Sequence, residues 1–167
     1  MRSDALKWLL VTCFGYLGYK NARFGRIESH EAVTGAGRDA ILLAKEIAED
    51  MGYVVLHILV DSLFAQPRHY SSKHQFEPLM DAISQRTGIP ISMDGVFRWV
   101  AFPPSRMDGR NAVPNRYFGV FQDGSIKVRG IEYRRRDTPP FIKDTQMEVL
   151  RILAQAETLE ETRGLLA

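Results

Sequence analysis

A single carboxylate, Asp61, stands between two apolar runs in the segment VVLHILVDSLFA, which covers residues 54 to 65. Each run has the composition of a β-strand, so the segment predicts a hairpin with Asp61 near its tip. A carboxylate there has two interpretations. It can be a catalytic metal ligand, because hard cations such as Mg²⁺ bind carboxylate oxygens. It can also be a polar residue that only satisfies backbone groups of the turn.

The second group of residues that could do chemistry is basic. Residues 98 to 136 hold nine Lys or Arg against three Asp or Glu, a net charge of +6, whereas residues 137 to 167 have a net charge of −3. Basic residues that cluster beside glycine turns favour phosphate contact over random charge scatter. Lys127 and Arg129 alternate to one face of a predicted strand, and Gly130 would let a phosphate backbone approach closely.

Composition limits the other functional classes. The chain has 167 residues, of which 45% are apolar and 25% charged, as expected for one globular domain with a real core. No apolar run approaches the ~18 residues of a membrane span, and the start MRSDALKWLL is a poor signal peptide. The only cysteine, Cys13, is expected to be a buried core thiol in a reducing, cytoplasmic compartment.

Four helices are expected to position these residues. The first begins at a cap on Ser3 or Asp4 and ends at Gly15 and Gly18. The second is capped by Ser29 and stopped by Gly52. The third starts near Glu77, because a proline at position 78 fits only a first turn, and ends at Gly88. The fourth is entered through Pro139-Pro140 and continues to the end of the chain.

The expected strands are antiparallel. Besides the hairpin with Asp61, residues 91–102 read as a strand with a turn or bulge at Asp94-Gly95, and residues 116–133 as a hairpin that turns at Asp123-Gly124. The run Arg134-Arg135-Arg136 is expected to be a solvated strand end, of which one member could pair with Asp137. Helices on one face of a mostly antiparallel sheet make an α+β domain.

Three segments together resemble a known family. They are LKWLLVTCFGYLGYKNARFGRIESHEAVT, VLHILVDSLF and NRYFGVFQDGSIKVRGIEYRRRDTPPFIKDTQ, and they occur in the order and spacing of the palm of family B DNA polymerases, most closely the archaeal members. The resemblance covers nearly the whole chain. It implies a single palm domain over residues 1–167, with the end of the last fingers helix at 1–18, the palm proper at 19–137 and the start of the thumb at 138–167. The family's exonuclease domain and first catalytic aspartate motif have no counterpart.

The resemblance assigns the acidic residues. The family holds Mg²⁺ with a Tyr-Gly-Asp-Thr-Asp-Ser hairpin and an aspartate from the missing motif. Asp61 matches the second aspartate of that hairpin, as a catalytic and metal-binding residue, while the first falls on Leu59, which has no oxygen to offer. Asp94 aligns less securely with an acidic metal ligand of the adjoining strand, and a turn before Gly95 explains it equally well. Mg²⁺ would bind weakly, or only in a completed complex.

The resemblance also assigns the ligand-binding residues. Lys7 matches the lysine that grips the incoming triphosphate, and Phe14 matches the ring beside the nascent base pair, whereas Val11 replaces an asparagine. Lys7 could equally be a surface lysine on an amphipathic helix. Five residues match elements that hold the primer end in the minor groove: Arg116, Tyr117, Lys127, Arg129 and Gly130.

These matches leave several functional hypotheses open. The chain could be part of a DNA-directed DNA polymerase that binds primer-template DNA and dNTP, is inactive alone, and is completed by a second polypeptide with the missing aspartate motif. It could instead be a non-catalytic DNA-binding or regulatory paralogue from the branch with eroded catalytic motifs. A truncated reading frame is a third possibility. Leu59 and Val11 favour the paralogue, whereas the presence of Lys7, Asp61 and Lys127-Arg129 keeps the split enzyme open.

Overall fold

The structure is a computed structural model that describes residues 2–105, 107–113 and 115–165. The chain divides into two compact units, the first up to Ile91 and the second from Ser92. Each unit is described by itself, and the single palm domain expected over residues 1–167 stays a prediction. Within the described residues, no helix combines the length and apolar character that crossing a membrane requires.

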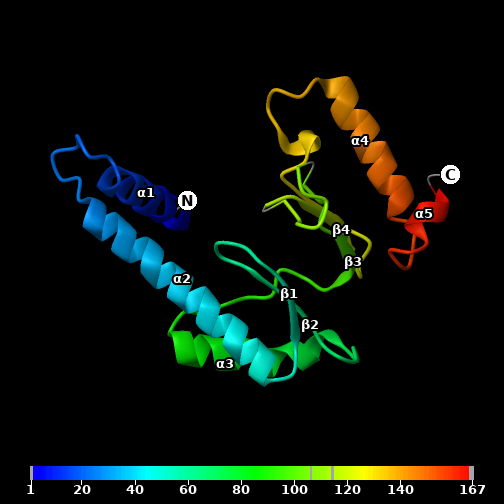
Figure 1. Ribbon diagram of the computed structural model, residues 1–167, viewed down its shortest axis with the longest axis horizontal. Helices are drawn as coiled ribbons and strands as arrows, with labels where there is room; N and C mark the ends of the chain where they lie inside the picture. Colours follow the sequence, from blue (N-terminus) through cyan, green and yellow to red (C-terminus); the bar gives the residue numbers. More distant parts are fainter. Residues whose placement is uncertain (1, 106, 114, 166–167) are drawn as a thin grey trace. The chain divides into compact units, whose positions relative to one another are not determined.

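Helices and small antiparallel sheets make both units, so the predicted α+β class is confirmed (Figure 1). The first unit contains α1 (Arg2–Leu17), α2 (Ile27–Asp50), β1 (Val54–Ile58), β2 (Leu63–Gln66), the 3₁₀ turn η1 (Lys73–Phe76) and α3 (Glu77–Thr87). The second unit contains β3 (Phe97–Ala101), β4 (Tyr117–Phe121), β5 (Ile126–Arg129), the 3₁₀ turn η2 (Glu132–Arg134), α4 (Pro140–Leu153) and α5 (Thr162–Leu165).

The strands form two sheets rather than the one that was expected. β1 pairs only with β2, and β3, β4 and β5 form a separate sheet in that order. Each sheet buries apolar side chains against the helices of its own unit. Residues of the first hairpin pack on α2 and α3, where Ile47 and Ile83 are buried, and Trp99 and Val120 of the second sheet pack on Leu153 of α4. The structure therefore has two separate hydrophobic cores, whereas the sequence predicted one sheet with helices on one face.

The helix boundaries agree with the prolines and glycines. α3 begins at Glu77 and ends before Gly88, whose φ of 69° is left-handed, and α4 begins at Pro140, so both predictions are confirmed. The predicted cap of α2 on Ser29 is wrong. The carbonyl of Arg26 accepts hydrogen bonds from the N–H groups of residues 29 and 30, both at 3.1 Å, and the cap therefore lies three residues earlier, at Arg26.

The last predicted helix is interrupted. α4 ends at Leu153, and only the short α5 follows it. The Nη2 of Arg98 donates to the carbonyl of Ala154 at 2.7 Å, and the indole N–H of Trp99 donates to the carbonyl of Ala156 at 3.1 Å. These bonds from β3 satisfy carbonyls that a continuing helix would have used, so the chain bends across the sheet instead.

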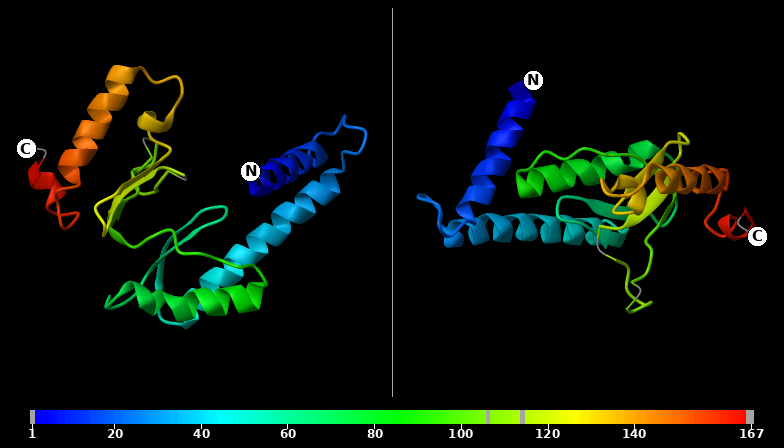
Figure 2. Two further views of the ribbon diagram at one scale, coloured as in Figure 1. Left: turned by 180° about the vertical axis from the view of Figure 1, so that it is seen from behind. Right: turned by 90° about the horizontal axis from the view of Figure 1, so that it is seen from above.

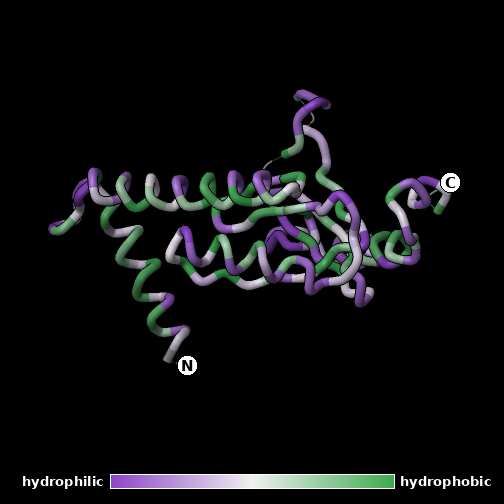
Figure 3. The backbone as a smooth tube through the Cα atoms, turned by 90° about the horizontal axis from the view of Figure 1, so that it is seen from below, coloured by the Kyte–Doolittle hydropathy of each residue, from purple (hydrophilic) through white to green (hydrophobic). Residues whose placement is uncertain are grey.

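α1 has apolar side chains around its whole circumference, and they are exposed. In Figure 2 the helix leaves the loop end of α2 at a steep angle, and Figure 3 shows hydrophobic residues along most of its length. Trp8 is 70% exposed, Leu9 58% and Leu10 68%. Cys13 is exposed as well, so the expectation of a buried core thiol is wrong. A helix that is apolar on every side is normally covered.

The isolated chain should therefore associate through α1. Burying side chains of this size stabilises contact by about 1.5–3 kcal/mol each, so Trp8→Glu with Leu10→Glu should weaken association at least about tenfold. Light scattering at increasing concentration measures this, against the monomer mass of 19.0 kDa. Met107→Glu is the control, because that side chain is 99% exposed but isolated in a loop. A monodisperse monomer at high concentration would contradict the expectation.

Candidate functional site

Asp61 lies at the exposed tip of the β1–β2 hairpin, as predicted. Ile58 pairs with Leu63 at the end of the ladder, and the N–H of Leu59 donates to the carbonyl of Ser62 at 2.8 Å. Asp61 therefore lies in the closed turn, outside the paired residues of the two strands. The Leu59 side chain is only 7% exposed, so this position of the hairpin has become part of the packed interior.

The metal site stays a prediction. No group of three or more His, Cys, Asp or Glu side chains that could hold an ion occurs among residues 2–105, 107–113 and 115–165. Asp61 belongs to the first unit and Asp94 to the second, so the structure defines the surroundings of each carboxylate separately. Each is exposed and offers oxygens of the kind that Mg²⁺ takes.

The predicted nucleotide-binding residues both lie on α1. The Phe14 ring stacks on the His30 ring of α2, with centroids 4.1 Å apart, and His30 Nδ1 lies within hydrogen-bond distance of the Phe14 carbonyl, at 3.1 Å. Gly18 allows this approach, because a Cβ there would come within 3.0 Å of the His30 ring. This contact joins α1 to α2 at the loop end. Lys7 is exposed further along the helix.

The register of the second sheet divides the predicted DNA-binding residues between two faces. Lys127 lies opposite Gly119, and Arg129 opposite Tyr117. Because alternate residues of a strand point to opposite sides, these side chains lie on the face away from the core residue Val120. We call this side of the sheet, which carries Tyr117, Gly119, Phe121, Lys127 and Arg129, the Lys127 face.

Asp94 lies beside this face and binds Lys127. The Nζ of Lys127 is 3.0 Å from one carboxylate oxygen of Asp94 and 3.3 Å from the other. The next residue, Gly95, passes beneath the Phe121 ring, where a Cβ would come within 2.6 Å of a ring carbon. The backbone there is also tied to the end of β4, since the Gln122 N–H donates to the Val96 carbonyl at 2.9 Å. A predicted metal ligand and a predicted DNA-binding lysine therefore form one ion pair.

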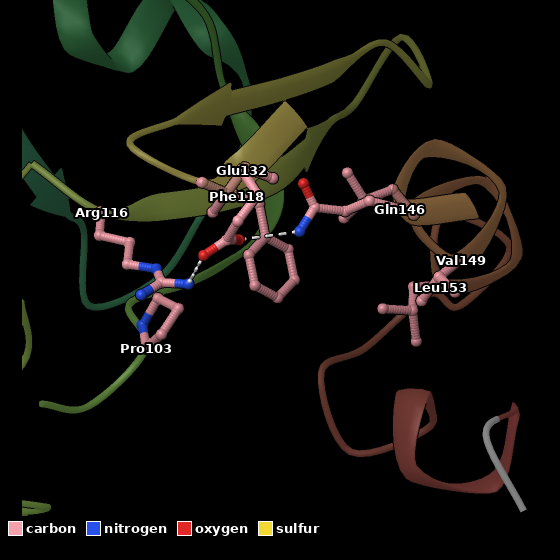
Figure 4. Close-up of a pocket in the computed structure, with 9 residues that line it drawn as sticks. Pro103, Arg116, Phe118, Glu132, Gln146, Val149 and Leu153 are labelled. Atoms are coloured by element: carbon pink, nitrogen blue, oxygen red, sulfur yellow. Dashed lines mark hydrogen bonds and ion pairs between the residues drawn. The ribbon is translucent and has the colours of Figure 1, made fainter. Parts of the chain in front are cut away.

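Arg116 lies on the opposite side of the sheet, in a pocket of about 180 Å³ beside α4 (Figure 4). Its guanidinium donates to Glu132 at 2.9 Å. Gln146 of α4 donates to the second Glu132 oxygen at 3.0 Å and accepts the Tyr133 N–H at 2.6 Å. Phe118 and Leu153 line the same pocket. Arg116 therefore helps to fasten α4 to the sheet and is not gathered with Lys127 and Arg129.

Glu132 is the residue of this network that sequence reasoning missed. Hydrogen bonds from Gln146 and from its own backbone, together with the charge of Arg116, hold the pKa of its carboxyl below the ordinary value. The network therefore favours the ionised carboxylate. The sequence did contain a signal, because Glu132 is an acidic residue within a strongly basic segment. Such a residue is expected to form an ion pair with a neighbouring cation. The expected pairing within the arginine run is confirmed, because Arg135 binds Asp137 at 2.8 Å.

Tyr117 and Gly130 both have structural roles. The Tyr117 side chain is 4% exposed and lies beside the Phe102 ring, with centroids 5.9 Å apart. Gly130 has a φ of 66°, and a Cβ there would lie only 2.1 Å from the Asn115 carbonyl oxygen. The glycine is thus required by the chain's own backbone. Their DNA contacts stay predictions. Arg129 is exposed on the Lys127 face.

Comparison with curated proteins finds archaeal DNA polymerases. "DNA polymerase 2" of Saccharolobus solfataricus is 32% identical over 98% of this chain and 24% of its own length. "DNA polymerase 2" of Aeropyrum pernix is 32% identical over 96% of the chain and 18% of its own length. "DNA polymerase" of Archaeoglobus fulgidus is 29% identical over 99% and 20%. No protein-family model matches the chain.

The resemblance to archaeal family B DNA polymerases is confirmed at this level, and the chain is homologous to a segment of them over nearly its whole length. The chain spans only 24% or less of the length of each of these three relatives. Their activity, substrates and partners do not transfer to it without further argument.

The geometry at Gly130 predicts a large effect of adding a methyl group. Gly130→Ala should lower the free energy of unfolding by more than about 3 kcal/mol, because it combines left-handed backbone strain, worth about 1–2 kcal/mol, with overlap on the Asn115 carbonyl. Gly124→Ala is the matched control. Its φ is 83°, but no atom lies within 4 Å of the new Cβ, so only the strain applies. Urea unfolding followed by circular dichroism compares them, and equal losses would contradict the overlap.

Proposed function

We propose that this homologue of archaeal family B DNA polymerases is the palm part of a polymerase and binds primer-template DNA through the Lys127 face. The observation that carries the proposal is the placement of Lys127 and Arg129 on one face, opposite Gly119 and Tyr117, in a segment homologous to a DNA polymerase. Two cations spaced along one strand can follow a phosphate backbone, and such contacts position a duplex without reading its sequence.

The proposed catalytic role depends on a second polypeptide. Two-metal phosphoryl transfer requires carboxylates that hold ions about 3.5–4 Å apart. Of the two hairpin positions that match the family's aspartates, only Asp61 supplies a carboxylate, since Leu59 is apolar and 7% exposed. We infer that a partner chain supplies the missing aspartate motif, that Lys7 and Phe14 bind dNTP and Mg²⁺ binds in the completed complex. Exposed α1 offers this partner a contact surface, and the expected location is the cytoplasm.

A non-catalytic DNA-binding or regulatory paralogue is the second candidate. The burial of Leu59 favours it, because a side chain that has joined the interior makes restoration of the metal hairpin costly. The two candidates share the DNA-binding surface and differ in catalysis. A neighbouring gene that ends with the missing aspartate motif would favour the split enzyme, and its absence would favour the paralogue.

The first test concerns DNA. Lys127→Gln with Arg129→Gln should reduce the slope of log affinity against log salt by roughly two units, similarly for all sequences. Fluorescence anisotropy with a labelled primer-template measures the slope. Arg68→Gln with Arg86→Gln is the control, since it removes the same charge from exposed positions of the first unit. An unchanged slope in the Lys127 and Arg129 variant would move the DNA-binding surface elsewhere.

The second test concerns catalysis. The isolated chain should not extend a primer with Mg²⁺ or Mn²⁺, and Leu59→Asp alone should not restore extension, because the aspartate of the other motif is still missing. A primer-extension assay beside an intact archaeal DNA polymerase measures this. Incorporation that disappears in Asp61→Ala would show that the chain is a working enzyme by itself and would overturn the need for a partner.

A further inference from the structure

The cations of the second unit differ in how firmly their acidic partners hold them. Glu132 has two side-chain partners, Arg116 at 2.9 Å and Gln146 at 3.0 Å, and connects the sheet to α4. Asp94 binds Lys127 alone among the described residues, at 3.0 Å, in a segment before β3. Arg129 has no ion pair within the described part of the chain.

The ion pair between Lys127 and Asp94 is accessible to solvent. The Lys127 side chain is 36% exposed and that of Asp94 69% exposed. Solvent reaches both charges, so their attraction is weak and easily exchanged for another anion. The backbone next to Asp94 is nevertheless held in place, because Gly95 passes beneath Phe121 and the Val96 carbonyl accepts the N–H of Gln122. The carboxylate therefore stays close to Lys127, and a phosphate has to compete with it for the ammonium group.

We propose that Asp94 is an intramolecular competitor that occupies Lys127 until a nucleic-acid phosphate displaces it. This inference rests on the proposed binding of DNA by the Lys127 face. The predicted DNA-binding cations then fall into three classes. Arg129 has no ion pair within the described residues, and Lys127 is paired with an exposed carboxylate that a phosphate can displace. Arg116 is bound to Glu132, which also binds α4 through Gln146. DNA contact at Lys127 therefore carries the cost of breaking one exposed ion pair.

Asp94→Asn should tighten binding to a labelled primer-template about two- to fivefold, the range set by an exposed ion pair. The same substitution in a Lys127→Gln background should not change the affinity, because Asp94 then has no lysine for which it competes with the phosphate. This double-mutant cycle separates a specific pair from a general change of charge. Fluorescence anisotropy at one fixed salt concentration provides the affinities, and circular dichroism melting checks that each variant is folded.

Asp144→Asn is the matched control. It makes the same substitution in the same unit, but this exposed side chain of α4 has no hydrogen bond or ion pair within the described residues. It should change affinity by less than about 1.5-fold. An equal gain from Asp144→Asn, a gain that persists without Lys127, or no gain from Asp94→Asn would each overturn the inference while leaving DNA binding intact. Absence of DNA binding by every variant would instead refute the proposed function.

Discussion

The pairing register of β4 and β5 is the constraint on which the proposed DNA-binding surface depends. A shift by one residue would exchange the two faces of β5 and turn Lys127 and Arg129 toward Val120 and Leu153, where their charges would be buried without partners. The register is maintained at both ends of β5. At one end Asp123 accepts hydrogen bonds from Ser125 in the turn, and at the other Gly130 packs against the Asn115 carbonyl. The acids Asp94 and Glu132 then meet different cations because they lie on opposite sides of this ladder.

The hairpin with Asp61 combines a closed backbone turn, one exposed carboxylate and one buried apolar side chain. The turn from Leu59 to Ser62 is closed by a hydrogen bond, and Asp61 remains exposed at its tip. Leu59 instead contributes apolar surface to the interior, which favours folding by about 25 cal/mol per Å² that it buries. An aspartate there would need compensating metal or hydrogen bonds. Leu59 provides packing that needs no partner, whereas a charge at the same position would need one.

Local signals predicted local structure well. Pro78 and Gly88 determine the ends of α3, Asp123-Gly124 forms the second hairpin turn, and Pro140 begins α4, since each acts through its own backbone. Apart from the predicted Ser29 cap of α2, the wrong expectations involve distant residues. The interruption after Leu153 depends on donors from Arg98 and Trp99, and the placement of Arg116 depends on Gln146 of another helix. Cys13 is exposed because no other element covers its side of α1 among the described residues. The apolar pattern of a helix sequence cannot predict which sides of the helix will be covered.

The two ends of α2 differ in how much tertiary packing stabilises them. Its buried residues are Ala44, Ile47 and Ala48, near the C-terminal end, where α3 and the β1–β2 hairpin cover it (Figure 1). The N-terminal part is supported mainly by α1 through the Phe14–His30 stack. Helices without packing are marginal, so transient opening should be frequent toward Ile27 and rare near Ala48. Local opening at the α1–α2 end should therefore leave the hairpin that holds Asp61 in place, because that hairpin packs on the other end of α2.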